Sequence, residues 1–344
     1  MRSAAGWLVL AALGFFPLAA DHFELPHQAV LALGVAVLAL SAGRYRVSRT
    51  FVAVMLAWLG VAALTTLTSR APALSAPALL TLAVVWSLGL FATPEADVTL
   101  RPVLWTVWPL AAWALAQALG RDPFEWSEVA RWCGGMRPFA TLGHPTQLGV
   151  WMAAMAVLAL DDARRSRWSL LTAVVAALTC FATLSRAGWL ALGVGVAVLA
   201  WTSRAWRLDR LLPAALGVVG LAALVAGPRA LLERVTHFFV APTRVQMWAT
   251  ALAGAREHPW LGHGFETFLL VDQQHRHPDA WRYEWGGTAG HAHSIVPQTL
   301  ATEGLLGLLV LLGCVALVLT GWRRAGRRDA GPRAVVVALA AASL

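Results

Sequence analysis

Residues 168–202 read WSLLTAVVAALTCFATLSRAGWLALGVGVAVLAWT, and this stretch decides the predicted fold. Two apolar runs, 168–184 and 187–202, flank a short polar break at Ser185 and Arg186. Each run comes close to the ~20 residues that an α-helix needs to cross ~30 Å of hydrocarbon. The stretch therefore predicts a pair of membrane-spanning helices joined by a tight turn.

Similar apolar runs recur along the whole chain, separated by short polar segments. Of all residues 58% are hydrophobic and only 13% are charged, a balance that excludes an ordinary soluble domain. The sequence thus predicts an all-α fold, a polytopic transmembrane helix bundle of eleven spans embedded in the lipid bilayer. The other predicted spans are 4–20, 28–42, 50–67, 73–92, 103–119, 146–160, 211–227, 295–320 and 333–344.

Arginine positions set the predicted orientation of these spans. None of the 27 basic residues is lysine, and the arginines gather in short loops between the apolar runs. With the N-terminus in the cytoplasm, sixteen of the 27 fall on the cytoplasmic side, as the positive-inside rule requires. The net charge of +9 is thus a topology signal, and no nucleic-acid partner is predicted.

The first and the last apolar runs allow separate predictions. The first run follows Arg2 and ends in small residues, so a cleavable signal peptide is an alternative to the uncleaved first helix that we prefer. The last run, 333–344, covers only about half a membrane thickness at a rise of ~1.5 Å per residue, which suggests an incomplete final span.

One long polar segment, 229–294, divides the chain into three predicted regions. Region 1–228 holds nine spans with short loops, and region 295–344 holds the C-terminal spans. The predicted topology places 229–294 on the outer, periplasmic face. Its many aromatic residues predict a loop that folds and contains short amphipathic helices.

One such helix is predicted to follow Pro242 and to end before Pro259. Its apolar positions recur every three or four residues, as one face of a helix requires: Val245, Trp248, Leu252 and Ala255. We expect this face to lie flat against the bundle at the outer membrane surface.

Two arginines stand at predicted helix starts, where backbone N–H groups and the helix dipole favour an anion. Ser185 is placed to cap the helix that contains Arg186, and Arg244 lies in the first turn of the loop helix. A cation there is unfavourable by ~0.3–1 kcal/mol unless an anion is shared with it. We interpret both as candidate anion ligands; the alternative is a snorkelling or surface arginine without a ligand.

Titratable side chains gather around the start of run 295–320. His293 is a candidate general base, since the reference pKa of ~6.5 lets histidine exchange protons near neutrality, and His291 is the reserve base. A histidine satisfied by the backbone is the alternative. Glu303 lies in the outer third of the run, where an ionisable group is a functional candidate or a partner of an arginine.

A metal site is another use for the histidines. His275-x-His277 and His291-x-His293 form alternating pairs whose imidazoles suit zinc or copper. Segment 229–294 contains no cysteine, and the intervals fit no standard zinc motif. The sequence therefore predicts no metal and no cofactor, with a heme- or metal-handling membrane protein as an alternative.

Three segments carry a family resemblance: Leu184-Ser185-Arg186-Ala187-Gly188; Arg244 to Trp248 followed by Glu257-His258-Pro259-Trp260-Leu261-Gly262-His263-Gly264; and His293-Ser294, Gln298 and Glu303-Gly304-Leu305-Leu306-Gly307. Together they resemble the bacterial O-antigen ligase and O-antigen polymerase family of integral-membrane glycosyltransferases. The resemblance implies twelve spans in the full family fold and a place in the bacterial inner membrane.

The resemblance also implies a reaction. A glycan carried on undecaprenyl pyrophosphate would be transferred, without metal, to a hydroxyl of a glycan or lipid-core acceptor at the periplasmic face. The implied catalytic residues are Arg186 and Arg244, which would bind the pyrophosphate, and His293, which would deprotonate the acceptor. The residues predicted to bind substrate are Trp248, His258, His291, Gln298 and Glu303.

A multi-pass transporter or flippase of polysaccharide intermediates or small anions is the main alternative function. Such proteins have broken helices and charged residues near the middle of the membrane. Apart from Glu303, almost no charge falls within the predicted spans, which favours the transferase.

Overall fold

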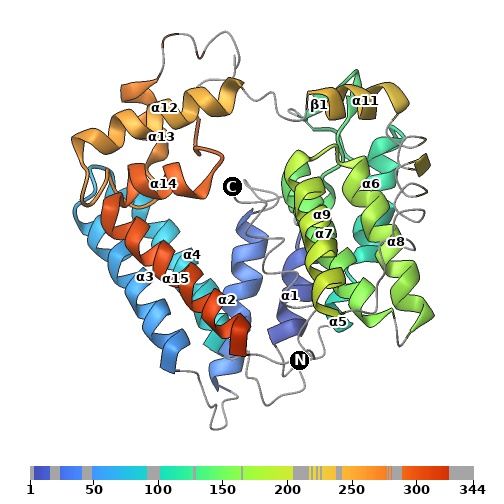
Figure 1. Cartoon of the computed structure of the whole chain (residues 1–344), viewed down its shortest axis with the longest axis horizontal. Coiled ribbons are helices and arrows are strands. Elements are labelled where there is room, and N and C mark those ends of the chain that lie inside the picture. The colour runs from blue at the N-terminus through green and yellow to red at the C-terminus, as the bar shows by residue number, and fades with distance from the viewer. Residues whose placement is uncertain are drawn as a thin grey trace. The chain divides into compact units, whose positions relative to one another are not determined.

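The computed structural model describes residues 4–15, 24–40, 49–90, 101–126, 129–163, 166–203, 227–237, 242–276 and 289–324, and a few single positions between 217 and 280. The described part of the chain is predominantly helical, which confirms the all-α prediction (Figure 1). Most of the predicted span 211–227 and all of 333–344 lie outside the described residues.

The chain divides into two compact units, each of which is described by itself. Unit 1 comprises Met1–Gly34, Pro94–Phe239 and Ala325–Ala342, and unit 2 comprises Val35–Thr93, Val240–Arg324 and Ser343–Leu344. Helix α2 (Glu24–Leu40) contains the boundary between them.

Unit 1 contains helices and one short hairpin. Its helices are α1 (Ala4–Leu13), α5 (Arg101–Leu104), α6 (Val107–Ala118), η1 (Ala140–Leu142), α7 (Pro145–Asp162), α8 (Arg167–Ala182), α9 (Arg186–Ser203) and α11 (Pro228–Thr236). Strands β1 (Arg131–Trp132) and β2 (Gly135–Met136) pair antiparallel. Cys133 and Gly134 form the two-residue turn between them, both with positive φ, as a tight hairpin turn requires.

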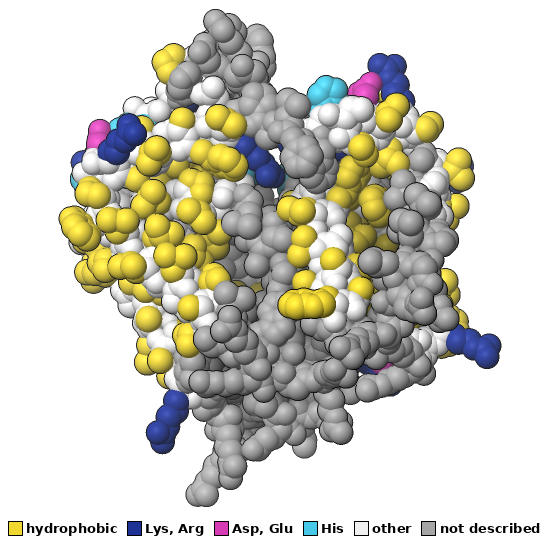
Figure 2. Space-filling view, in the orientation of Figure 1, with side chains coloured by type: hydrophobic (Ala, Val, Ile, Leu, Met, Phe, Trp, Pro, Cys, Tyr) yellow, Lys and Arg dark blue, Asp and Glu magenta, His cyan; other side chains and the backbone are white. Residues whose placement is uncertain are grey.

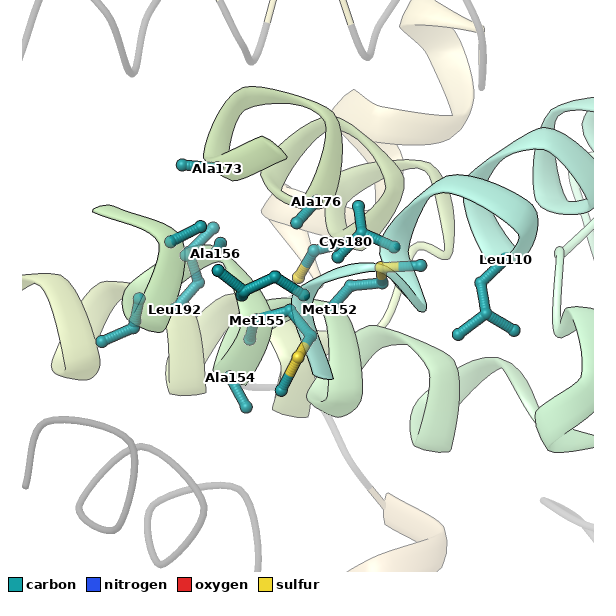
Figure 3. Close-up of a cluster of buried hydrophobic side chains, with 14 of the residues drawn as sticks. Leu110, Met152, Ala154, Met155, Ala156, Ala173, Ala176, Cys180 and Leu192 are labelled. Atoms are coloured by element: carbon teal, nitrogen blue, oxygen red, sulfur yellow. The ribbon is translucent and has the colours of Figure 1, made fainter. Parts of the chain in front are cut away.

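The core of unit 1 lies where α7 packs against α8 and α9. Figure 3 shows Met152 and Met155 of α7 in this cluster with Cys180 of α8 and Leu192 of α9. A Cβ added to Gly188 in α9 would meet the backbone of Gly149 in α7 at 2.8 Å. Small residues therefore let the two backbones approach closely, which is how helices commonly pack in membranes.

Unit 2 contains six helices among its described residues: α3 (Arg49–Leu67), α4 (Pro72–Leu90), α12 (Pro242–Glu257), α13 (Phe268–His275), α14 (Ile295–Thr302) and α15 (Gly304–Arg324). Helices α3 and α4 pack together, and α15 packs against α3. Helix α12 packs on α13 and α14 around a buried cluster that includes Met247, Ala251, Phe268 and Val271.

Two predicted spans coincide with helices, and a third does not form one continuous helix. Runs 168–184 and 187–202 correspond to α8 and α9. The prediction of one continuous span at 295–320 was wrong, because the chain breaks at Glu303 into α14 and α15, with Gly304 at a φ of +67°. Within the described residues, none of the helices combines the length and the apolarity that crossing a membrane would take.

The predicted contact face of the loop helix was also wrong. Helix α12 forms as expected, and Ala255 of the predicted face is buried, but Val245 and Leu252 are exposed and Trp248 is 39% exposed. The buried face instead carries Met247 and small residues such as Gly254. The physical reason is close packing, since a Cβ on Gly254 would lie 2.5 Å from Cγ1 of Val271 in α13. A larger side chain would hold the two helices apart.

Candidate functional site

The turn that precedes Arg186 has a strained backbone. Ser185 caps α9, as predicted, because its Oγ accepts a hydrogen bond of 3.1 Å from the backbone N–H of Gly188. Leu184 has a φ of +52°, a left-handed conformation that costs a non-glycine residue about 1–2 kcal/mol. The surrounding structure must therefore hold this turn in place.

Two arginines that the sequence analysis missed hold the turn. Nε of Arg137 donates to the carbonyl oxygen of Thr183 at 3.0 Å, and its Nη2 donates to that of Leu184 at 3.4 Å. Nε of Arg234 donates to the same Leu184 carbonyl at 2.9 Å, and its guanidinium carbon lies 4.4 Å from the centroid of the Trp132 ring. Both arginines therefore hold the backbone of Leu184, two residues before Arg186.

Positive charge is concentrated around this turn. Burial, together with the nearby charges of Arg234 and Arg186, lowers the pKa of Arg137 to about 10. Arg186 is fixed by its own bond, since its Nη1 donates to the carbonyl oxygen of His237 at 3.1 Å. Three guanidinium groups so close together favour the binding of an anion.

The second group of candidate residues lies in unit 2, where His293 precedes α14. Two side chains hold the backbone on its N-terminal side. Nε1 of Trp248 donates to the carbonyl oxygen of Ala292 at 3.1 Å, and Oε1 of Gln298 accepts from the Ala292 N–H at 2.8 Å. Trp248 and Gln298, predicted to bind substrate, thus also fix the segment that carries His293.

The environment of His293 favours the neutral form of its imidazole. Burial lowers the pKa of His293, and the positive charges of Arg244 and of His291, when it is protonated, lower it further. A neutral imidazole has a lone pair that accepts a proton, as a general base must. Arg244 thus acts on His293 within unit 2, whereas Arg186 belongs to unit 1. The meeting of all three residues stays a prediction.

Two carboxylates, those of Glu266 and Glu303, lie in unit 2 together with His293. Oε2 of Glu266 lies 3.8 Å from Nδ1 of His291 and 3.5 Å from Nε2 of Gln298. Glu266 was not among the residues predicted from the sequence. Glu303, which was, is only 4% exposed and occupies the break between α14 and α15.

The loop that follows α12 is fixed to this break by its backbone. The N–H groups of His263 and Gly264 donate to the carbonyl oxygens of Ala301 and Thr302 at 3.0 and 2.9 Å. A Cβ on Gly262 would lie 2.4 Å from the carbonyl carbon of Thr302. Glycine is therefore required where the two backbones meet.

Near this loop, His258 lies among other titratable groups. Its Nε2 is 3.1 Å from Nη2 of Arg70, and both residues line a cavity of about 350 Å³. Glu257, His258 and His263 are the one set among the described residues whose metal-donor atoms all lie within 4.8 Å of one another. The histidine pairs predicted from the sequence do not make up this set, and His277 lies outside the described residues.

Comparison with known proteins agrees with the motifs. Residues 171–312, which include Arg186, Arg244 and His293, match the family described as O-antigen ligase. No curated protein matches the chain. The family match supports a glycosyltransferase of the O-antigen ligase or polymerase type. It confirms the resemblance expected from the three segments: residues 171–312 of this chain are similar to the O-antigen ligase family.

Proposed function

We propose that this protein is an inner-membrane glycosyltransferase. It moves a glycan from undecaprenyl pyrophosphate to an acceptor hydroxyl, on a lipid core or on another glycan, at the periplasmic face. The O-antigen ligase match supports this class of reaction. The positions of the arginines and of His293 support the assignment of roles within it.

In the proposed step, His293 takes the proton of the acceptor hydroxyl as that oxygen bonds to the anomeric carbon of the donor sugar. The bond between this carbon and the pyrophosphate oxygen breaks, and undecaprenyl pyrophosphate leaves with the bonding electrons. Arg186 and Arg244 bind the departing pyrophosphate, because forked guanidinium donors match phosphate oxygens and remain charged. Stabilisation of this growing negative charge lowers the barrier to transfer.

The arrangement around His293 is the observation that carries the proposal. Arg244 and burial lower the pKa of His293, and Trp248 and Gln298 fix the backbone before it. The proposed base and one proposed phosphate-binding cation thus belong to one unit, and the lowered pKa favours a neutral base that can accept a proton.

Exposed apolar side chains support the membrane location. Figure 2 shows hydrophobic side chains over much of the surface that carries α3 and α15 in Figure 1. On α3, Leu56 is 58% and Leu67 is 84% exposed, and on α15 Leu309 is 63% exposed. Large apolar surfaces of this kind mark contact with lipid or with a partner, and lipid is the proposed environment.

A reconstituted assay tests the proposal. The full chain, in lipid nanodiscs, is supplied with an undecaprenyl-pyrophosphate-linked oligosaccharide and several acceptors, and the products are identified by mass spectrometry. We expect His293→Ala to lower transfer by about 100-fold or more, as loss of a general base does, with unchanged abundance in the membrane. His291→Ala should retain more activity. Near-normal transfer by His293→Ala would remove His293 from the role of base.

A further inference from the structure

Four side chains with metal-binding atoms gather at the end of α12, apart from the segment that carries His293. Glu257 ends α12, His258 follows it, His263 lies in the next loop, and His275 ends α13. The donor atoms of the first three lie within 4.8 Å of one another. Nε2 of His275 lies 3.4 Å from Oε2 of Glu257, and its ring centroid is 5.8 Å from that of His263.

The donor set suits one chemical class of ion. Imidazoles and a carboxylate are ligands that zinc binds in a tetrahedral site, and the donor atoms of Glu257, His258 and His263 lie within 4.8 Å of one another. Softer ions favour thiolates, and magnesium or calcium favours an all-oxygen set. The absence of cysteine from these four positions is thus compatible with zinc.

The bonding of His263 fixes which of its nitrogens is free for a metal. Its Nε2 lies 3.1 Å from the carbonyl oxygen of Gly254. Since a carbonyl only accepts hydrogen bonds, Nε2 must carry the proton, and the lone pair stays on Nδ1. Metal-binding histidines commonly donate their other N–H to a backbone carbonyl in this way, which orients the ring.

His275 supplies an independent observation. Its Nε2 is buried and makes no well-formed hydrogen bond among the described residues, while Oε2 of Glu257 lies 3.4 Å away, an ion-pair distance when the imidazole is protonated. A buried nitrogen without a well-formed hydrogen bond is unfavourable. A metal ion held between His275, Glu257 and His263 would satisfy this nitrogen.

We propose that Glu257, His258, His263 and His275 bind a zinc ion, which clips the ends of α12 and α13 to the loop between them. The cavity of about 350 Å³ lined by Glu257, His258 and His263 gives the ion access. The ion takes no part in the transfer step proposed above, and the site does not depend on that proposal.

Arg70 competes with the metal for one ligand. Its exposed guanidinium lies 3.1 Å from Nε2 of His258, and arginine can only donate, so this nitrogen accepts a hydrogen bond when no metal is bound. Zinc that binds this nitrogen must displace Arg70, whose positive charge also repels the ion. Arg70→Ala should therefore tighten zinc binding.

Metal titration of the purified full chain tests the site. Protein stripped with a chelator is titrated with zinc by calorimetry and with cobalt, which is followed by its visible spectrum. We expect one zinc per chain, a spectrum typical of tetrahedral cobalt, and a melting temperature that rises with zinc. Glu257→Gln and His275→Gln should each lower the affinity by more than the roughly 10–100-fold that loss of an outer-shell partner costs.

His291→Gln is the matched control, because His291 and Glu266 form another histidine–glutamate pair in unit 2, 3.8 Å apart. This variant should bind zinc as the unchanged protein does, and the melting temperature without metal shows that each variant is folded. Binding that is equally strong in all folded variants, absent from the unchanged protein, or weakened by Arg70→Ala overturns the proposal.

Discussion

The position of Arg186 depends on bonds that other residues make. Leu184, two positions earlier, has left-handed backbone, and the carbonyls of Thr183 and Leu184 accept bonds from Arg137 and Arg234. Arg244, by contrast, lies in the first turn of α12, where the helix itself sets the backbone. A local helical pattern was sufficient to suggest Arg244, whereas the support of Arg186 depends on residues about 50 positions away.

Replacement of either candidate arginine by lysine tests whether the guanidinium shape is needed. We expect Arg186→Lys and Arg244→Lys each to lower transfer by about 100-fold, the usual cost of one lost donor that stabilises developing negative charge. An ammonium keeps the charge but cannot make paired bonds to a phosphate. Arg256→Lys, on the exposed surface at the end of α12, is the matched control and should keep its activity. The measurement is the rate of product formation, and near-normal rates for both variants would contradict the role in pyrophosphate binding.

The pH dependence of transfer tests the environment of His293. Only neutral imidazole accepts a proton, so the rate should fall as pH drops through the pKa of His293. Burial, Arg244 and His291 lower this pKa, so the fall should come below the ordinary histidine value of ~6.5. Arg244→Gln removes a charge that lowers the pKa, and should move the midpoint of the pH–rate profile to higher pH. A midpoint that stays in place or moves to lower pH would contradict the proposed effect of Arg244 on the pKa of His293.

At the scale of helices, the apolar runs predicted where helices form, but they did not predict which faces of the helices are buried. Runs 168–184 and 187–202 correspond to α8 and α9, because apolar runs of this length are typical of helices and too long for strands. In α12, apolar residues occur on more than one side, so periodicity could not tell which side is buried. Gly254 decides it, since its lack of a side chain lets α13 approach.

The break between α14 and α15 likewise depends on a contact with a distant segment, which the local sequence does not show. The run 295–320 is apolar throughout most of its length and reads as one helix, yet it ends at Thr302 and restarts at Gly304. The N–H groups of Leu305 and Leu306 donate to the carbonyls of Pro259 and Trp260 instead. A distant loop therefore interrupts the helix, and only the glycines of that loop hint at such a contact.

Two glycine substitutions, one at this junction and one inside α15, should have opposite effects on stability. Gly262→Ala places a Cβ 2.4 Å from the carbonyl carbon of Thr302 at a φ of +63°, so we expect it to destabilise unit 2 by about 3 kcal/mol. Gly313→Ala, in the interior of α15 with nothing within 4 Å, should instead stabilise by about 0.5–1 kcal/mol. Thermal unfolding in detergent measures both, and equal melting temperatures would contradict the proposed backbone contact.

At the scale of the whole molecule, the candidate residues are shared between two units. Arg186 belongs to unit 1 with Arg137 and Arg234, and Arg244 and His293 belong to unit 2. The sequence motifs could name the three principal residues, because each stands at a helix start with recognisable neighbours. They could not name Arg137, Arg234 or Glu266, whose contacts arise only when segments distant in sequence come together.

The predicted membrane topology has a natural reporter in Cys133, which is exposed in the turn between β1 and β2. The topology places this turn outside the cell, so a membrane-impermeant maleimide added to intact spheroplasts should label Cys133, and Cys133→Ser should remove the signal. Ser166→Cys in the Cys133→Ser background lies on the predicted cytoplasmic side and should be labelled only after the membrane is permeabilised.

The chemistry of Cys133 adds a check on the local structure. Its Sγ donates to Oε2 of Glu233 at 2.8 Å, and this bond raises the pKa of the thiol. Because the thiolate is the reactive form, labelling at neutral pH should be slow, and Glu233→Gln should speed it by lowering that pKa. Mass spectrometry of the labelled protein over time measures the rate. Labelling of Cys133 only after permeabilisation would invert the topology, while an unchanged rate in Glu233→Gln would contradict the contact between β1–β2 and α11.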